Sequence, residues 1–513
     1  MTLSFLRLWG DFMYRKNNKE QLTIEDFFLP FGGKLDANNR WVKLAEITPW
    51  DRIEEYYLQS MSQETGRGAI PARIAFGAVS LRQSERTSDE GTVRYIQENP
   101  YAQYYLGLHE FHTEPLFDPS MMVHFRKRFP IEFVAKVNEF ICTGKWPEEM
   151  RDVDRNDDDP GSGAGGSNKS ESVAEESAKE QNHGTLIMDA TVADADIKYP
   201  TDIDLLNQCR EHLETAIDLL WTYVPHEQHK YPYNRKKARQ GFLNISKSKK
   251  WTRKKLRTGI GLQLGYIEKA SERLEEMQKL VPDWEKKFPY WLRDRLEVIP
   301  HVYLQQKEMY DSGTHRCEDR IVSLQQPHIR PIVRGKRPDP TEFGQKLHLS
   351  VVDGYTFIEQ TCWNNYNEGN DLPHVVENYR RRYGYYPSAV LADRIYQTRE
   401  NRSYCKARGI RISGPALGRP KDEAAKEASQ AQMYQDACDR NMVEGKNGTA
   451  KRRYGLGRIM SKLDETSKTE AGFSILMMNA WKRVYRELLR SFLQLLFWSE
   501  YEWPVMETMP VFQ

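Results

Sequence analysis

One segment in the first half of the chain cannot contribute to a hydrophobic core. Residues 151–183 are acidic and rich in Gly and Ser, as in "GSGAGGSNKSESVAEESAKE", and they lack aromatic side chains and nearly all large aliphatic ones. Such a segment buries too little apolar surface to offset the entropy lost on ordering, so we expect a disordered linker. The 513-residue chain is therefore predicted to divide into an N-terminal domain at 1–150 and a larger domain that begins at 184.

The part before the linker reads as a series of short helices. "IPARIAFGAVSLRQ" has helical apolar spacing after Pro71, and "SDEGTVRYIQENP" begins on Ser88 and stops at Pro100. "DPSMMVHFRKRFP" ends at Pro130 with three cations in its last turn. These helices are predicted either to bind DNA or simply to pack as a bundle, with the cations favoured by the negative helix C-terminus.

The part after the linker alternates strands and helices. "TLIMDATVADADI" is a strand pattern, and a helical region at about 203–340 follows it. Two strands joined near Gly354, a helix, the short strand "SAVLAD" and a further short strand then precede a helical end at about 421–500. We predict an α/β domain at 184–495, in which a mixed β-sheet is flanked by helices and carries a large helical insertion after its first strand, with a C-terminal tail at 496–513.

Charge is segregated along the chain, although the net charge is only +2. The stretch from 235 to 257 holds eleven Lys or Arg and no acid, so any nucleic-acid surface must be local. No CxxC pair occurs among the six cysteines, which argues against a zinc ribbon or finger. No apolar run approaches the length of a membrane span, and we expect a cytoplasmic protein without a membrane partner.

Two carboxylates interrupt or end apolar strands. Asp189 follows Leu186–Met188, and Asp393 ends "SAVLAD". Each alone is better explained as a capping or ion-paired residue, but a pair at strand ends is typical of a site for a hard divalent cation. Glu444 is the candidate third acid, since it shares a helical stripe with Arg440 and Lys451. The neighbouring Gly445 and Gly448 are unfavourable in a helix unless something approaches closely.

Four motifs in this order carry a resemblance to a known family. "MDATVADADIKYPTD", "EFGQKLHLSVVDGY", "VLADRIY" and "RNMVEGKNGTAKRRYGLGRI" resemble DDE transposases of bacterial insertion sequences, of the insertion sequence five type, over roughly 184–480. The family signature of Tyr, two residues, Arg, three residues, Glu, six residues and Lys matches Arg440, Glu444 and Lys451. Ala437 stands where the signature has Tyr. Asp194 and Asp196 compete for the first acid and rank below Asp189, which precedes "ATV" as in the family.

The resemblance implies an RNase H-like catalytic core in which Asp189, Asp393 and Glu444 hold two Mg²⁺ ions, with Mn²⁺ as an alternative. It implies cleavage at the ends of an insertion sequence and transfer of the 3′-hydroxyl to target DNA by a homodimer in the bacterial nucleoid. An endonuclease without strand transfer and an inactive DNA-binding relative remain as alternatives. The predicted DNA contacts are Arg440, Lys446, Lys451, Arg452, Arg453, Lys249, Lys250, Arg253 and Lys254.

Overall fold

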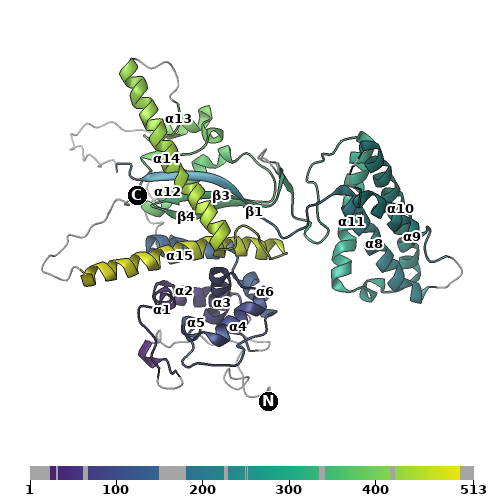
Figure 1. The fold of residues 1–513 in the computed structure, drawn as a ribbon, viewed down its shortest axis with the longest axis horizontal. Coiled ribbons are helices and arrows are strands. Elements are labelled where there is room, and N and C mark those ends of the chain that lie inside the picture. Colours follow the sequence, from purple (N-terminus) through teal and green to yellow (C-terminus); the bar gives the residue numbers. More distant parts are fainter. Residues whose placement is uncertain are drawn as a thin grey trace, which may run out of the picture.

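The computed structural model describes residues 24–29, 33–61, 68–149, 181–224, 229–248, 250, 252–333, 341–415 and 422–496. Most of the predicted linker and nearly all of the predicted tail lie outside the described residues. Figure 1 shows the described parts as a helical bundle, a central sheet and a separate group of helices. None of the described helices combines the length and the apolar character needed to cross a lipid bilayer.

The first part of the chain is helical, as predicted. It contains a 3₁₀ turn η2 (Ile24–Asp26) and helices α1 (Arg40–Ile47), α2 (Trp50–Gln59), α3 (Ala72–Glu85), α4 (Asp89–Glu98), α5 (Pro100–Tyr105), α6 (Met121–Arg128) and α7 (Ile131–Thr143). The predicted start at Ser88 is confirmed, because its hydroxyl accepts a hydrogen bond from the Gly91 amide at 3.0 Å. Asn99 ends α4 and caps α5, where Pro100 occupies the first turn.

The central sheet is mixed, in agreement with the predicted α/β class. Its strands are β1 (Thr185–Asp194), β2 (Pro331–Val333), β3 (Thr341–Val352), β4 (Tyr355–Cys362), β5 (Ala389–Leu391) and β6 (Arg411–Ile412). The order is β2-β3-β1-β5-β6, and β4 pairs with β3. β1 is antiparallel to β3 and parallel to β5. The predicted turn between β3 and β4 is the pair Asp353–Gly354, both with positive φ, as a two-residue hairpin requires.

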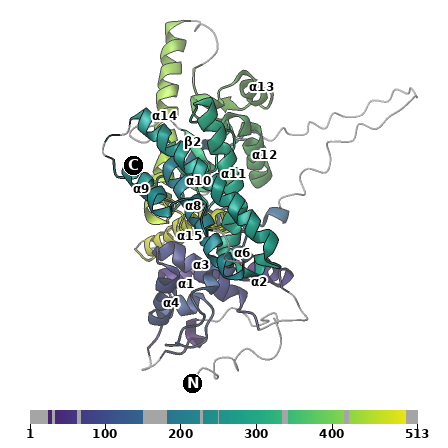
Figure 2. The same cartoon turned by 90° about the vertical axis from the view of Figure 1, so that its right-hand side faces the viewer.

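The predicted insertion is a helical unit with its own hydrophobic core. It consists of α8 (Asp202–Leu220), η5 (Trp221–Tyr223), α9 (Arg235–Ser246), α10 (Arg253–Leu280), η6 (Trp284–Lys287) and α11 (Tyr290–Ser312). Buried apolar residues of α8, α10 and α11 form one cluster, including Leu213, Ile267 and Leu292. Figure 1 shows this unit beside the sheet rather than on it, and in Figure 2 the same unit faces the viewer. It leaves the sheet after β1 and returns at β2 and β3.

The last helices join the two ends of the chain. After β4 come η7 (Glu368–Asp371) and α12 (Leu372–Tyr383); η8 (Arg394–Tyr396) and α13 (Arg399–Ala407) follow β5, and α14 (Glu423–Arg453) and α15 (Asp464–Leu496) follow β6. α15 belongs to the core of the N-terminal helices, where Phe473, Met477 and Trp481 are buried. The rings of Trp41 and Trp481 lie 4.9 Å apart. The helical bundle is therefore completed by a helix more than 300 residues later in the sequence.

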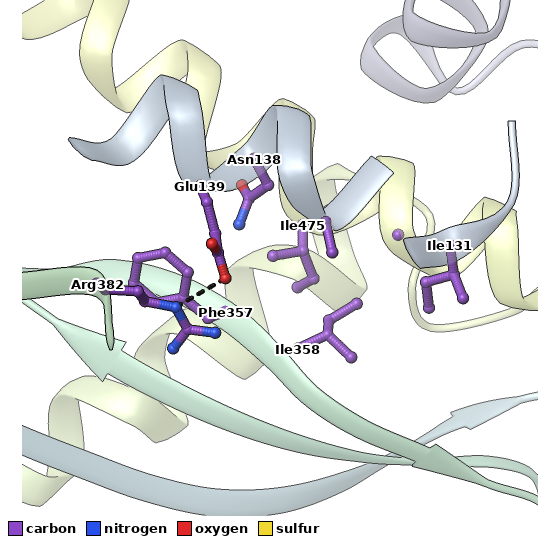
Figure 3. Close-up of a pocket in the computed structure, with 9 residues that line it drawn as sticks. Ile131, Asn138, Glu139, Phe357, Ile358, Arg382 and Ile475 are labelled. Atoms are coloured by element: carbon purple, nitrogen blue, oxygen red, sulfur yellow. Dashed lines mark hydrogen bonds and ion pairs between the residues drawn. The ribbon is translucent and has the colours of Figure 1, made fainter. Parts of the chain in front are cut away.

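A buried ionic junction fastens this bundle to the sheet. The guanidinium of Arg382, on α12, lies 2.9 Å from Glu139 of α7 and 2.5 Å from Glu359 of β4. Figure 3 shows Arg382 and Glu139 facing each other at a small pocket lined mainly by apolar side chains such as Phe357 and Ile475. Because all three charged groups are buried, Arg382 and Glu359 depend on one another for compensation, and Glu139 is compensated by Arg382 and by Arg381, which lies 2.5 Å away.

Candidate functional site

Asp189 lies inside β1 rather than at its end, and Asp393 follows the end of the adjacent parallel strand β5 at the same level. The last pair of the β1–β5 ladder is Ile187 with Leu391, and each aspartate is two residues further along its chain. Residues two apart in extended backbone point to the same face, so both carboxylates continue the face of Ile187 and Leu391. These two residues share a buried cluster with Val443 of α14. The face that bears the aspartates is therefore the one that α14 crosses.

Helix α14 contacts both aspartates. Asn447 donates a hydrogen bond from Nδ2 to Oδ2 of Asp189 at 3.3 Å. The guanidinium of Arg440 lies 3.2 Å from Oδ1 of Asp393. Glu444 is one turn after Arg440 and one turn before Asn447, so it lies on the stretch of α14 between the two contacts. The structure thus brings all three predicted acids to one region.

The three carboxylates differ in exposure. The side chain of Asp393 is 60% exposed, Glu444 is exposed, and Asp189 is half-buried on β1. Within the described part of the chain, no group of three or more His, Cys, Asp or Glu side chains is arranged to hold a metal ion. Asp189 and Asp393 instead contact an amide and a guanidinium of α14. The donor set itself, three carboxylates, has the oxygen chemistry that Mg²⁺ prefers.

A series of buried hydrogen bonds holds the loop that carries Asp393. Oδ1 of Asp393 accepts a hydrogen bond from the Arg394 amide at 2.6 Å and so caps η8, which ends at Tyr396. The hydroxyl of Tyr396 lies 2.9 Å from Nε2 of His348, and Nδ1 of His348 lies 3.0 Å from Oδ2 of Asp371. His348 and Tyr396 are almost completely buried. These hydrogen bonds fix the backbone from which the Asp393 carboxylate projects.

Two further features hold this loop close to the sheet. A Cβ on Gly369 of η7 would lie 2.4 Å from the carbonyl oxygen of Ile395, so only glycine allows η7 and η8 to approach this closely. The pKa of Tyr396 is raised, first by burial and then by the negative charges of Glu368 and Asp189. Tyr396 therefore stays a neutral phenol near Asp189. The sequence interpretation missed His348, although a histidine within the apolar run "LHLSVV" was a detectable signal.

The competing acids Asp194 and Asp196 lie further along the chain. Asp196 forms an ion pair with Arg458 at 3.3 Å. Burial raises the pKa of Asp194, and Glu342 adds to this, whereas Lys451 and Arg458 act in the opposite direction. Lys451 is therefore close enough to Asp194 to influence its charge. These acids are associated with the end of α14 and the segment after it.

The predicted DNA contacts of α14 point in different directions. Arg440 faces Asp393, as described above. Lys446 is half-buried on the other side of the helix, near the turn between β3 and β4. Arg452 and Arg453 are exposed, and the Arg452 carbonyl accepts a hydrogen bond from Arg86 of the N-terminal bundle at 2.6 Å. Arg440 and Lys451 share the helical stripe of Glu444, whereas Lys446 and Arg453 lie on the opposite side of α14.

The other predicted DNA contacts lie on the insertion. Lys250, Arg253 and Lys254 are exposed at the beginning of α10, and Lys249 lies outside the described residues. Arg235, at the start of α9, is held by Glu214 and Asp218 of α8 at 2.9 and 3.1 Å. The rest of α9 adds the exposed cations Lys236, Lys237 and Arg239. The exposed cations of α9 and those around the beginning of α10 therefore form a cationic surface on the insertion.

The space around Gly445 is open, whereas a Cβ on Gly448 would lie 3.4 Å from the guanidinium of Arg452. A Cβ built on Gly445 would meet no atom within 4 Å, so the packing of the protein does not require glycine there. Ala437, where the family signature has Tyr, is exposed on α14. Helix α14 is anchored just before it by a bidentate pair between Asp436 and Arg411 of β6, at 2.6 and 2.9 Å. The position of α14 over the sheet thus does not depend on an aromatic residue at 437.

Comparison with known proteins gives two family matches. Residues 390–480 match the model of a transposase DDE domain, and this range contains Asp393 and Glu444. Residues 30–128, in the N-terminal bundle, match the model of a transposase domain. No solved structure matches the chain.

A curated relative covers a shorter region. The uncharacterised protein ORF8 in the nfe locus of Rhizobium meliloti is 34% identical over 102 residues, which is 19% of this chain and 49% of that protein. The chain thus spans about half the length of this relative. The two family models fall on opposite ends of the chain, in parts that the structure shows sharing one core through α15. Both matched domains are transposase domains, so the comparisons support a DDE transposase of insertion sequences.

Proposed function

We propose that this transposase cleaves DNA strands at the ends of an insertion sequence and joins the freed 3′-hydroxyl to target DNA by a two-metal DDE mechanism. The observation that carries the proposal is the common level of Asp189 and Asp393 on parallel strands, with Glu444 on the helix that contacts both. Strands β3, β1 and β5 with α14 across them also support an RNase H-like core. Asp189, Asp393 and Glu444 are the proposed catalytic residues.

The same three carboxylates are the proposed metal ligands. When bound, a pair of Mg²⁺ or Mn²⁺ ions would activate a water or a 3′-hydroxyl and stabilise the leaving oxygen. The protein orients the ligands: Asn447 holds one oxygen of Asp189, and the Arg394 amide holds one oxygen of Asp393. Arg440 must then release Asp393, and its freed guanidinium is well placed to meet a phosphate.

DNA would follow the cationic surfaces. Arg440, Lys451, Arg452 and Arg453 of α14 are proposed to hold phosphates near the acids, and the beginning of α10 would hold a second part of the duplex through Lys250, Arg253 and Lys254. The N-terminal bundle, which matches a transposase domain, is proposed to recognise the terminal inverted repeats. Since two ends must be brought together, we propose a homodimer in the DNA complex, acting at the bacterial nucleoid.

A strand-transfer assay tests the reaction. The substrate is a labelled duplex with the sequence that borders the coding region, pre-cut to expose its 3′-hydroxyl, mixed with plasmid target and Mg²⁺. The proposal predicts label covalently joined to the plasmid. Cleavage of an uncut end without joining would indicate an endonuclease. DNA binding without either reaction would indicate an inactive relative.

A further inference from the structure

Two lysines from different helices converge on the turn between β3 and β4. A Cβ on Gly354, where φ is 72°, would lie 2.4 Å from Nζ of Lys482 and 3.9 Å from Cε of Lys446. Nζ of Lys482, on α15, also donates a hydrogen bond to the carbonyl oxygen of Asp353 and lies 4.2 Å from the centre of the Tyr355 ring. The ends of both lysines are therefore near one backbone turn.

This cluster carries positive charge that no carboxylate of the described part of the chain pairs with. Both lysines are half-buried, and Arg486, one turn further along α15, adds a third charge. Within the described residues, no carboxylate lies at ion-pair distance from these three cations, whereas Lys468 and Arg483, elsewhere on α15, are paired with Asp464 and Glu487. The groups that face the cluster are the Cys142 thiol, the Asp353 carboxylate and the Tyr355 hydroxyl.

In the free protein, the three cations repel one another and so destabilise one another's charged forms. The pKa of Lys482 is lowered to about 8, first by burial and then by Lys446 and Arg486. Bringing like charges together and partly out of water costs free energy. An anion bound between them would recover that cost. A tetrahedral oxyanion suits the cluster, because two ammonium groups and one guanidinium can donate to several of its oxygens.

The position of the cluster relative to Glu444 indicates which anion it binds. At 100° per residue, Glu444 and Lys446 point about 160° apart on α14, so they lie on opposite sides of the helix. Gly445, between them in sequence, is exposed and would have free space around a side chain. We propose that Lys446, Lys482 and Arg486 bind a backbone phosphate of DNA that lies across α14 at Gly445. This inference rests on the proposed function for the identity of the DNA and adds a phosphate site behind the acids.

The test measures DNA affinity without catalysis. Anisotropy of a labelled duplex is recorded in EDTA at several salt concentrations for the full chain and for Lys446→Met combined with Lys482→Met. The proposal predicts that the slope of log K against log salt falls by about 1, because one phosphate contact is lost, and that affinity falls for every DNA sequence. The control is Lys468→Met, on α15 but paired with Asp464, which should leave the slope nearly unchanged. An unchanged slope in the double variant overturns the proposal.

A second variant and a second ligand keep the outcomes separate. If the double variant does not fold, Arg486→Gln alone should still lower the slope, by no more than about 1. Inorganic pyrophosphate should compete with the duplex in the wild type but less in the double variant. If pyrophosphate raises the melting temperature through these lysines while DNA affinity does not depend on them, the site binds a free anion and the DNA assignment is wrong. Because EDTA excludes metal-dependent cleavage, lysine-dependent binding would stand even if strand transfer failed.

Discussion

Arg440 forms its ion pair with Asp393, 3.2 Å away across the sheet edge, and not with Glu444 one turn along its own helix. Helical spacing alone favours a pair between Arg440 and Glu444, four residues later. The observed pair leaves Glu444 exposed and occupies the carboxylate of Asp393, one of the three proposed metal ligands. In the free protein, Arg440 therefore competes with a cation for Asp393.

This competition gives the first prediction. Arg440→Gln should strengthen Mn²⁺ binding in the absence of DNA by up to about fivefold, because a partly exposed ion pair is worth at most about 1 kcal/mol. Electron paramagnetic resonance of free Mn²⁺ measures the change. Arg394→Gln is the matched control, since it removes an exposed cation beside Asp393 that forms no ion pair with it. Equal effects of the two variants would show only a general charge effect.

The buried hydrogen bonds that link Tyr396, His348 and Asp371 give the second prediction. Tyr396→Phe keeps the ring but leaves Nε2 of His348 without its buried partner, which should lower the free energy of unfolding by about 1–3 kcal/mol. Urea unfolding measures this loss. Tyr404→Phe removes a phenol that contacts Glu377 in a half-buried setting and should cost less. If the free energy of unfolding falls equally in both variants, the hydrogen bonds through His348 have no special role in holding the loop.

Much of the fold followed from local patterns, whereas the site depended on long-range pairing. Asp189 and Asp393 were found because each stands out in an apolar strand, a signal confined to a few residues. Their common level could not be predicted, because it is set by the parallel pairing of strands about 200 residues apart. The role of α15 in the N-terminal core was missed for the same reason. Its helical pattern predicts a buried face and not the partner of that face.

The ionic junction between bundle and sheet gives the third prediction. Burial favours the neutral form of Glu359, but Arg382 and hydrogen bonds from Ser350 and Asn378 outweigh it, so the net pKa is lowered. A lowered folded-state pKa means that this stability is complete above the unfolded pKa of about 4.3 and is lost as the pH falls through the folded value. Urea unfolding between pH 3 and 7 should show this loss, and Glu359→Gln should flatten it.

The same junction can be tested by removing its cation. Arg382→Met leaves Glu139 and Glu359 buried without their shared partner and should cost about 3–5 kcal/mol (Figure 3). Arg52→Met, which breaks the exposed pair with Glu149, should cost about 1 kcal/mol or less. A similar small loss for both would show that the buried junction does not stabilise the contact between bundle and sheet.

The open space at Gly445 predicts opposite effects of one substitution on protein stability and on DNA affinity. Gly445→Ala should raise the free energy of unfolding by about 0.5–1 kcal/mol, since a helical alanine is favoured and nothing obstructs its methyl group. If DNA crosses the helix here, the same variant should weaken duplex binding. Unfolding and anisotropy are measured on one preparation. Greater stability with unchanged DNA affinity would place the DNA elsewhere.

The most direct measurement is Mg²⁺-dependent cleavage of the DNA that borders the coding region, by the wild type and by Asp189→Asn, Asp393→Asn and Glu444→Gln. Each substitution removes a proposed metal ligand, and each should lower the cleavage rate by more than about 100-fold, because even the supporting partners of metal ligands account for 10- to 100-fold. Asp196→Asn, which alters an acid paired with Arg458, should cleave at nearly the wild-type rate. Near-normal cleavage by any of the three ligand variants would contradict the proposed site.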